Sequence, residues 1–335
     1  MIRTTSRICN LKQTIGFSTL AVSGVLFLCS QPAVSDSDFR YLLGLSVGIR
    51  NIEFDLDSMG SPSFFVLNDG NGPVIPATTG ARQSFDFEES LYTAGFSGTL
   101  IYDRFSLSAL VELPLQAEDT SLHTSIASLP GAGVPINDVS DRDSELDRFD
   151  VGLTLGYRVW EGLSVFSGYK HTEFDLESRE YNLLLSNKDQ NYVEEGFFIG
   201  SSYAWQFGNK GSLSLSIAYA YLDTEFSESN VAKEPPPFGF VFDEFAYNGS
   251  SNGLSYGAHW SGRLTGQWLY TVGLKYQSYN SNNNATTLQG LFGDNFLSQD
   301  PAVSIPVSAT PIAVTGIDTK HTDATFSAGI MYMLQ

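Results

Sequence analysis

Short segments in which apolar residues occupy every second position dominate the chain after residue 36. In residues 148–159 the odd positions are all apolar, from Phe149 to Val159, while the even positions hold Arg, Asp, Thr or Gly. A β-strand turns successive side chains to opposite faces, so this period of two predicts a strand with one apolar and one polar face. Such a strand has to lie between two unlike media.

Ten segments share this alternation, with apolar faces that run through residues 41–49, 92–102, 105–115, 149–159, 163–169, 197–207, 213–221, 254–264, 270–276 and 326–334. Tight turns are expected at residues 103–104, 160–162, 208–211 and 266–269, and long polar connections at about 58–86, 117–145, 178–191, 229–251 and 281–320. Strict alternation of short and long connections, with both chain ends on the short side, is what a transmembrane β-barrel requires. We therefore predict an all-β fold, a transmembrane antiparallel up-and-down β-barrel of about ten strands with long extracellular loops and short periplasmic turns. Eight strands, or twelve if residues 285–316 add a pair, are the alternatives.

The direction of the apolar faces separates this prediction from a soluble β-sandwich or lipocalin-like barrel, in which they would point inward. The opposite faces are rich in small residues, such as Gly44, Ser46 and Gly48. A strand face in open water more often carries Lys and Glu, so small polar residues favour a narrow lumen. Nine alternating residues tilted by ~40° span ~23 Å, close to the ~25 Å apolar band of membrane-spanning barrels.

The first 35 residues differ from the rest of the chain. Basic residues precede an apolar run from Ile15 to Leu28, and Ala33-Val34-Ser35 places small side chains before Asp36. This three-part pattern predicts a cleaved signal peptide at residues 1–35 and a single barrel domain at residues 36–335. The apolar run is shorter than the ~20 residues that a spanning helix needs.

Composition excludes several classes of function. Three of the 18 basic residues precede Asp36, so the remaining 300 residues hold 15 basic and 37 acidic residues. This acidic balance argues against a nucleic-acid partner, which requires clustered Lys and Arg. Both cysteines, Cys9 and Cys29, lie in the leader. We expect neither disulfides nor Cys-ligated metal in the barrel, and no cofactor.

Residues 39–334 as a whole resemble the Gram-negative outer-membrane β-barrel class. The resemblance implies a multi-pass barrel in the cell outer membrane, with lipid, lipopolysaccharide and the barrel-insertion machinery as partners. Members usually end in an alternating strand closed by an aromatic residue. Here the alternating run ends at Leu334 and Gln335 follows, so the insertion signal departs from the pattern of the class.

Weak internal repetition links several outward-running strands. Residues 47–58 (VGIRNIEFDLDS) and 167–178 (SGYKHTEFDLES) match, and residues 272–280 keep the same frame. The repeat places Arg50, Lys170 and Lys275 on the polar face, toward the outer half of the barrel. After Arg50 the apolar residues change phase, which predicts either a β-bulge or a strand that leaves the bilayer.

The polar faces bring ionisable groups into the lumen. If the short turns fix the register, Gly95 faces Glu112 and Gly152 faces Lys170. Charges in a narrow lumen are expected to pair, because an isolated one loses its hydration. The cluster acts either as a small-solute filter or as an ion-paired plug that holds the barrel's shape. Its predicted members are Glu112, Asp150, Arg158, Lys170, Glu194, His259, Arg263 and Lys275.

An acidic extracellular rim is predicted near the junctions of strands and long loops. Carboxylates at this height can share divalent cations with lipopolysaccharide phosphates, or form a solvated collar. No calcium-loop motif accompanies them. The predicted rim consists of Glu53, Asp55, Asp57, Glu173, Asp175, Glu177, Asp223 and Glu225.

Two functional hypotheses follow, a small porin-like channel or structural envelope barrel, and a surface-binding barrel (an adhesin or receptor) that acts through its long loops. An outer-membrane protease or lipid-modifying enzyme is a third class. The omptin proteases have ten strands and use Asp–Asp and Asp–His pairs at the outer mouth. Here His171 beside Glu173 is the rim cluster of acid–base type, but the strand repeat replaces His171 by Asn51 and Tyr276. We therefore expect no enzymatic activity and assign no catalytic residue.

Overall fold

The computed structural model describes residues 39–63, 79–115, 118–128, 137–180, 186–234, 239–283, 286–289, 312–314 and 317–334. The predicted signal peptide and the last residue lie outside these ranges. Nearly all described residues belong to β-strands, and no helix among them is long and apolar enough to cross a membrane.

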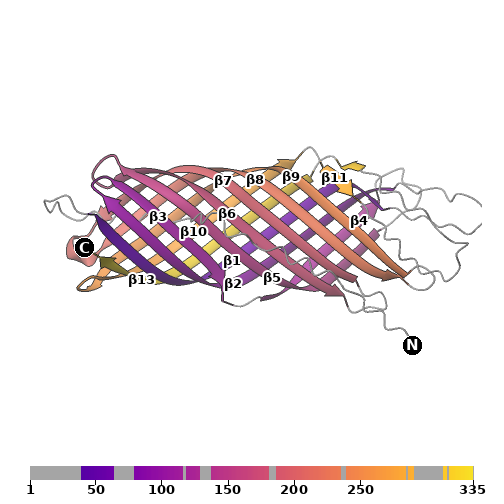
Figure 1. The fold of residues 1–335 in the computed structure, drawn as a ribbon, viewed down its shortest axis with the longest axis horizontal. Coiled ribbons are helices and arrows are strands. Elements are labelled where there is room, and N and C mark those ends of the chain that lie inside the picture. The colour runs from indigo at the N-terminus through magenta and orange to yellow at the C-terminus, as the bar shows by residue number, and fades with distance from the viewer. Residues whose placement is uncertain are drawn as a thin grey trace, which may run out of the picture.

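The strands form one closed antiparallel barrel (Figure 1). Its wall consists of ten antiparallel strands, when β3 and β4 are counted as one, and β1 pairs with β13 to close the cylinder. The bounds are β1 Arg40–Ser63, β2 Thr79–Tyr102, β3 Phe105–Pro114, β4 Glu118–Ser128, β5 Asn137–Arg158, β6 Leu163–Glu180, β7 Ser186–Gln206, β8 Ser212–Glu234, β9 Gly239–Thr265, β10 Trp268–Asn283 and β13 Ile317–Leu334.

Strands β3 and β4 follow one another in the same position of the wall and count as one barrel strand, since both pair with β2 and β5. Two short strands, β11 Thr286–Gln289 and β12 Ile312–Val314, are not counted among the ten. β11 pairs with the outer end of β9, and β12 pairs with β11. The predicted up-and-down barrel of about ten strands is confirmed. The predicted turn at Asp103-Arg104 joins β2 to β3, with Asp103 in the left-handed region (φ 52°) that tight hairpin turns require.

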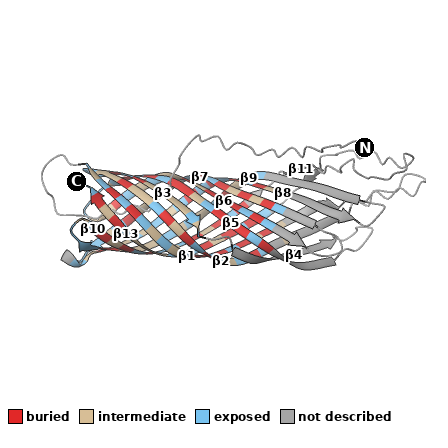
Figure 2. Ribbon diagram, turned by 60° about the horizontal axis from the view of Figure 1, so that its bottom comes forward, coloured by how far each residue is buried: buried red, intermediate tan, exposed pale blue. Residues whose placement is uncertain are grey.

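Strand β1 shows how the wall is built. From Tyr41 to Asp57 its odd residues face outward and its even residues face the lumen, and Figure 2 shows the alternating colours. From Tyr41 to Ile49 the outward residues are apolar and exposed. From Asn51 onward the outward residues are polar, and the inward residues Ile52 and Phe54 are apolar and buried.

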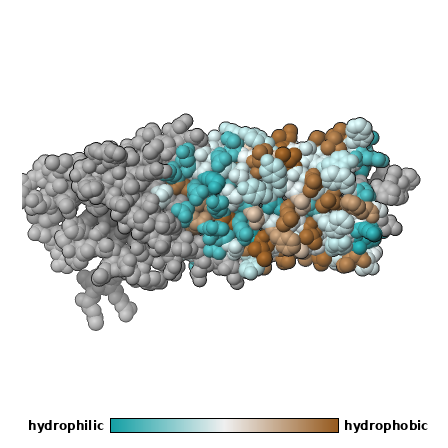
Figure 3. Space-filling view, turned by 180° about the vertical axis from the view of Figure 1, so that it is seen from behind, coloured by the Kyte–Doolittle hydropathy of each residue, from teal (hydrophilic) through white to brown (hydrophobic). Residues whose placement is uncertain are grey.

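No bulge accompanies this change, because β1 keeps its register with both neighbours through Arg50 and shifts only between Met59 and Ser61. The bulge alternative is therefore wrong, and the strand that leaves the bilayer is the arrangement found. Figure 3 shows the same change from outside, with hydrophobic atoms near the periplasmic turns and a hydrophilic girdle beyond them.

The strands are longer than the sequence pattern predicted. Strand β2 begins at Thr79 and β9 at Gly239, both inside segments expected to be loops. At about 3.3 Å per residue and a tilt near 40°, the 24 residues of β1 cover roughly 60 Å along the barrel axis, more than twice the ~25 Å apolar band. The barrel wall therefore projects well beyond the membrane.

Candidate functional site

The lumen is filled in layers, whose order follows from the direction of each strand. On β1, which runs outward, the small residues Gly44 and Ser46 come first, Arg50 follows, and Ile52 and Phe54 come last. Strand β2 runs the opposite way and presents Phe87 before Ser97. A cavity, an ion-paired layer and an apolar core therefore succeed one another from the periplasmic side outward.

The apolar core closes the lumen on the extracellular side of the ion-paired layer. Aromatic rings pack at its centre, with the rings of Phe54 and Tyr192 4.8 Å apart and those of Phe54 and Phe87 5.6 Å apart. Strands β1, β2, β5, β6, β7 and β8 all contribute to it. Its buried members are Ile52, Phe54, Leu56, Phe87, Leu91, Leu146, Phe174, Leu176, Tyr192 and Phe226.

Arg50 is the centre of the ion-paired layer. Its side chain is only 1% exposed, and its guanidinium binds two carboxylates at once. Nη2 donates to Glu112 Oε2 at 2.6 Å, and Nη1 donates to Asp150 Oδ2. Nε donates to Thr325 Oγ1 at 3.1 Å and lies 3.5 Å from Asp323 Oδ1. One arginine thus ties together strands β1, β3, β5 and β13.

A second arginine, Arg148, completes this network. Its Nε donates to Asp150 Oδ2 at 2.6 Å and its Nη2 donates to Asp323 Oδ2 at 2.9 Å. Its guanidinium also lies 4.5 Å from the centre of the Phe174 ring, so the ion-paired layer touches the apolar core directly. Asp150 Oδ1 accepts from Thr172 at 2.7 Å and from Arg148 Nη2 at 3.0 Å.

Glu194 is the centre of a second group in the same layer. Its Oε2 is 3.0 Å from His321 Nδ1 and 3.8 Å from Lys170 Nζ, and its Oε1 accepts from Tyr192 at 2.9 Å. Lys170 Nζ also lies 4.0 Å above the ring of Tyr279. Every carboxylate of the layer therefore has at least one basic partner, which offsets the cost of removing it from water.

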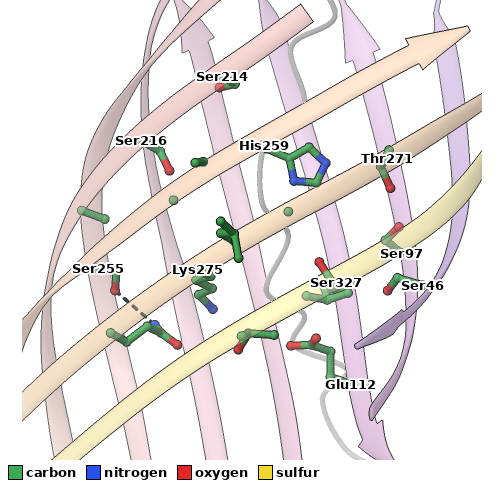
Figure 4. Close-up of a pocket in the computed structure, with 18 of the residues that line it drawn as sticks. Ser46, Ser97, Glu112, Ser214, Ser216, Ser255, His259, Thr271, Lys275 and Ser327 are labelled. Atoms are coloured by element: carbon green, nitrogen blue, oxygen red, sulfur yellow. Dashed lines mark hydrogen bonds between the residues drawn. The ribbon is translucent and has the colours of Figure 1, made fainter. Parts of the chain in front are cut away.

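A cavity of about 180 Å³ lies on the periplasmic side of this layer (Figure 4). Serine and threonine hydroxyls make up much of its wall, together with His259, Lys275 and Glu112. A small apolar cluster of Leu42, Leu269, Met331 and Met333 narrows the lumen toward the periplasmic turns.

The predicted lumen residues separate into two groups. Gly95 lies opposite Glu112 and Gly152 opposite Lys170, as predicted. Arg158 and Arg263 lie elsewhere, at the periplasmic end. Arg158 donates from Nη2 to the carbonyl of Asp103 in a turn, and Arg263 is exposed. The other predicted lumen residues, Glu112, Asp150, Lys170, Glu194, His259 and Lys275, face the interior.

Sequence reasoning left four residues out of the predicted cluster, namely Arg50, Arg148, His321 and Asp323. A usable signal was present, because each has the same parity as the small lumenal residues of its strand. Asp323 and His321 continue the inward series Gly329, Ser327 and Thr325. They were missed because they lie beyond the apolar band, where the outward residues that mark the opposite face are no longer apolar.

The predicted acidic rim lies on the outer wall of the strands and not at strand-to-loop junctions. Glu53, for example, is in the middle of β1. The junction prediction was wrong because the apolar outward pattern ends at the bilayer surface while strand pairing continues. The eight predicted residues Glu53, Asp55, Asp57, Glu173, Asp175, Glu177, Asp223 and Glu225 all face outward or lie partly exposed there.

Several of these outer-wall carboxylates face a like charge on the next strand. Asp55 lies opposite Asp86, and Glu53 lies opposite Glu88. Like charges in directly opposed positions destabilise a sheet. Partial burial raises the pKa of Asp55; Lys320 opposes this, while Glu53 and Asp86 raise it further.

Asp175 repeats this arrangement on β6, where it lies opposite Asp147. Partial burial raises the pKa of Asp175, and the carboxylates of Glu173, Asp147 and Glu177 add to the effect. Asn191 opposes the shift by donating from Nδ2 to Asp175 Oδ1 at 2.7 Å. Among the residues that the structure describes, no group of three or more His, Cys, Asp or Glu side chains forms a metal site.

His171, the residue weighed for acid–base chemistry, lies on the outer wall. Its Nδ1 is 3.1 Å from Glu195 Oε2, and its Nε2 is 3.9 Å from Glu173 Oε2. The second described histidine at this level, His321, is buried inside the barrel against Glu194. Neither lies in an Asp–His pair at the mouth.

No protein-family model matches the sequence, and no curated protein matches it. Among solved structures, the outer-membrane protease OmpT from Escherichia coli matches with a TM-score of 0.60 at 11% identity, over 88% of this chain and 97% of OmpT. A Pseudomonas aeruginosa FadL homologue gives a TM-score of 0.30 at 10% identity, over 88% of this chain and 90% of that one. The P. putida toluene transporter TodX gives a TM-score of 0.32 at 9% identity, over 90% of this chain and 91% of TodX.

The likeness to OmpT is one of fold. Together with the exposed apolar band, it establishes the chain as a β-barrel of the Gram-negative outer-membrane class. The predicted class and cell location are thereby confirmed.

The ion-paired layer generates a prediction on stability. Arg50→Met would remove the basic partner of Glu112 and one of the two arginines that bind Asp150, so we expect the free energy of unfolding to fall by about 3–5 kcal/mol. The matched control is Lys320→Met on the outer wall, where the pair with Glu53 is 3.5 Å long and half exposed. Its loss should cost at most ~1 kcal/mol. Denaturant unfolding in lipid, followed by tryptophan fluorescence, measures both, and equal losses would contradict the assignment.

The outer wall generates a prediction on pH. Because the folded-state pKa values of Asp55 and Asp175 are raised, their ionised forms destabilise the fold at neutral pH, and this penalty disappears as the pH falls through those pKa values. Asp55→Asn and Asp175→Asn should each stabilise the protein at pH 7.5 by about 0.2–1 kcal/mol and lose that advantage toward pH 4. Unfolding midpoints across this range test it, with Glu161→Gln in a periplasmic turn as control. A gain that does not depend on pH would refute the electrostatic cause.

Proposed function

We propose that this protein is a closed, non-conducting envelope barrel that raises its extracellular end above the membrane as a binding or structural surface. The observation that supports this most strongly is the filling of the lumen. The apolar core and the ion-paired layer lie across the path that a solute would take, and they draw on nearly every strand of the barrel.

The number of strands supports the same proposal. Barrels of about eight strands are filled by side chains, whereas sixteen or more leave a wide aqueous channel. Here the filling contains charges that satisfy one another, with the guanidinium of Arg50 shared between Glu112 and Asp150. A conduction path would need groups that release ions readily, and these pairs hold each other at 2.6–3.0 Å in several contacts.

The length of the barrel supports a role for its extracellular end. More than half of β1 lies beyond the apolar band, and residues 52–57 of this part have an apolar interior and an acidic exterior. It is therefore built as a water-soluble barrel on top of a membrane anchor. Its acidic wall lies at the height of lipopolysaccharide headgroups, so we propose that divalent cations mediate contact with their phosphates.

The same proposal assigns no catalytic role to the barrel. OmpT shares the fold, but His171 and His321 here pair with glutamates, and His171 faces outward from the wall. Incubation of the folded protein with peptide substrates and with lipid A tests this, and hydrolysis of either would overturn it.

Planar-bilayer recording tests the closed lumen. We expect the folded wild-type protein to give no conductance steps above background, because the apolar core excludes hydrated ions. The double variant Phe54→Ala, Phe174→Ala removes two rings from that core and should give measurable steps. The matched control, Phe96→Ala, Phe326→Ala, removes two lipid-facing rings and should remain silent.

Regular conductance steps from the wild-type protein, in preparations that migrate as folded on unboiled gels, would contradict the proposal and favour the small porin-like channel.

A further inference from the structure

The cavity on the periplasmic side of the ion-paired layer is large enough for an organic ligand. Its volume of about 180 Å³ exceeds the roughly 150 Å³ of an engineered protein cavity that binds benzene. That engineered cavity is apolar and dry, whereas this one is lined by hydroxyls from many strands, labelled in Figure 4. They include Ser46, Ser97, Ser214, Ser216, Ser255, Thr271 and Ser327.

Small residues keep this space open. A Cβ atom at Gly273 would lie 2.6 Å from His259 Nδ1, and one at Gly257 would lie 2.5 Å from Ser216 Oγ. Larger residues at these positions would push the polar groups out of place. The glycines and serines of the lumenal faces thus create a cavity with polar groups from several directions, which is the usual form of a small-molecule site.

The direct ion pairs at this level leave one lysine of the cavity wall without a carboxylate in contact. Glu112 and Asp150 are bound by Arg50, Asp323 by Arg148, and Glu194 by Lys170 and His321. These pairs use the four carboxylates that face the lumen at this level. Lys275 lines the cavity and has no salt bridge within 4.0 Å to any residue that the structure describes.

A lysine ammonium group that lines a polar cavity, with no carboxylate within 4.0 Å of it, can take an anion as its partner. Lys275 and Arg50 lie on either side of Thr325 in the sheet, since both are paired with that residue in register. Both also line the cavity. Two basic side chains and Glu112 therefore border the end of the cavity next to the ion-paired layer, and Figure 4 shows the Lys275 side chain between the serines and Glu112.

We propose that this cavity binds a small hydroxylated carboxylate, of the sugar-acid class. The carboxylate of the ligand would bind Lys275, and its hydroxyl groups would exchange hydrogen bonds with serines such as Ser216 and Ser327. This inference goes beyond the closed envelope barrel, because the ligand needs access from the periplasmic side alone.

Access from that side passes the apolar cluster near the turns. Two of its members, Met331 and Met333, are unbranched and adapt readily to a passing solute. Met331 lies in both the cluster and the cavity wall. The cluster thus lies between the cavity and the periplasmic end, where Arg158 and Arg263 are found.

Isothermal titration calorimetry on the folded protein in detergent, at neutral pH, tests the site with gluconate as the probe. We expect saturable binding of gluconate at one site per chain and at least tenfold weaker binding of glucitol, its neutral counterpart with the carboxylate replaced by an alcohol. This comparison uses the wild-type protein and does not depend on any variant. Absence of gluconate binding at millimolar concentration would mean a cavity filled by water alone and would overturn the proposal, as would equal binding of glucitol.

A pair of lysine variants then locates the site. Lys275→Gln should weaken gluconate binding at least tenfold, while Lys320→Gln, on the half-exposed outer wall, should leave it unchanged. Heat-modifiable migration on a gel confirms that each variant is folded. Unchanged affinity in folded Lys275→Gln, or an equal loss in Lys320→Gln, would contradict binding in the cavity.

Discussion

The change of surroundings partway along each strand is the constraint on which the rest of this structure depends. A strand has only two faces, and pairing on both sides fixes which residues belong to each. Within the bilayer the outward face must be apolar, and above it the outward face must be polar. Strand β1 meets both demands without a break in register, changing from Ile49 outward to Ile52 inward within three residues.

The ion-paired layer lies where this change occurs. On its periplasmic side the lumen contains glycine and serine, and on its extracellular side it contains Phe54, Phe174 and other apolar groups. Charged side chains at the boundary between these two interiors join several strands through single arginines. An isolated charge would lose its hydration at this depth, and the sharing of three carboxylates between Arg50 and Arg148 offsets that loss.

Much of this was accessible from the sequence, and the reasons for the remainder are physical. The alternation of apolar residues and the lengths of the connections predicted the number of barrel strands. The turn lengths predicted the cross-strand pairs Gly95–Glu112 and Gly152–Lys170. Strands β2 and β9 begin at Thr79 and Gly239, inside segments predicted to be loops because the apolar alternation of the membrane-spanning part does not extend into them. Arg148 and Asp323 could be placed on the inward face by parity, but their meeting across the barrel depends on curvature and on strands remote in sequence.

The central claim is that Phe54 and Asp55, adjacent in the chain, lie in a dry core and in water, while Leu45 faces lipid. No cysteine follows Cys29, so single cysteines at these three positions can carry spin labels in a bilayer. Collision with oxygen should be greatest at position 45, collision with an aqueous nickel complex greatest at position 55, and both low at position 54. Ready access of the nickel complex to position 54 would contradict the account.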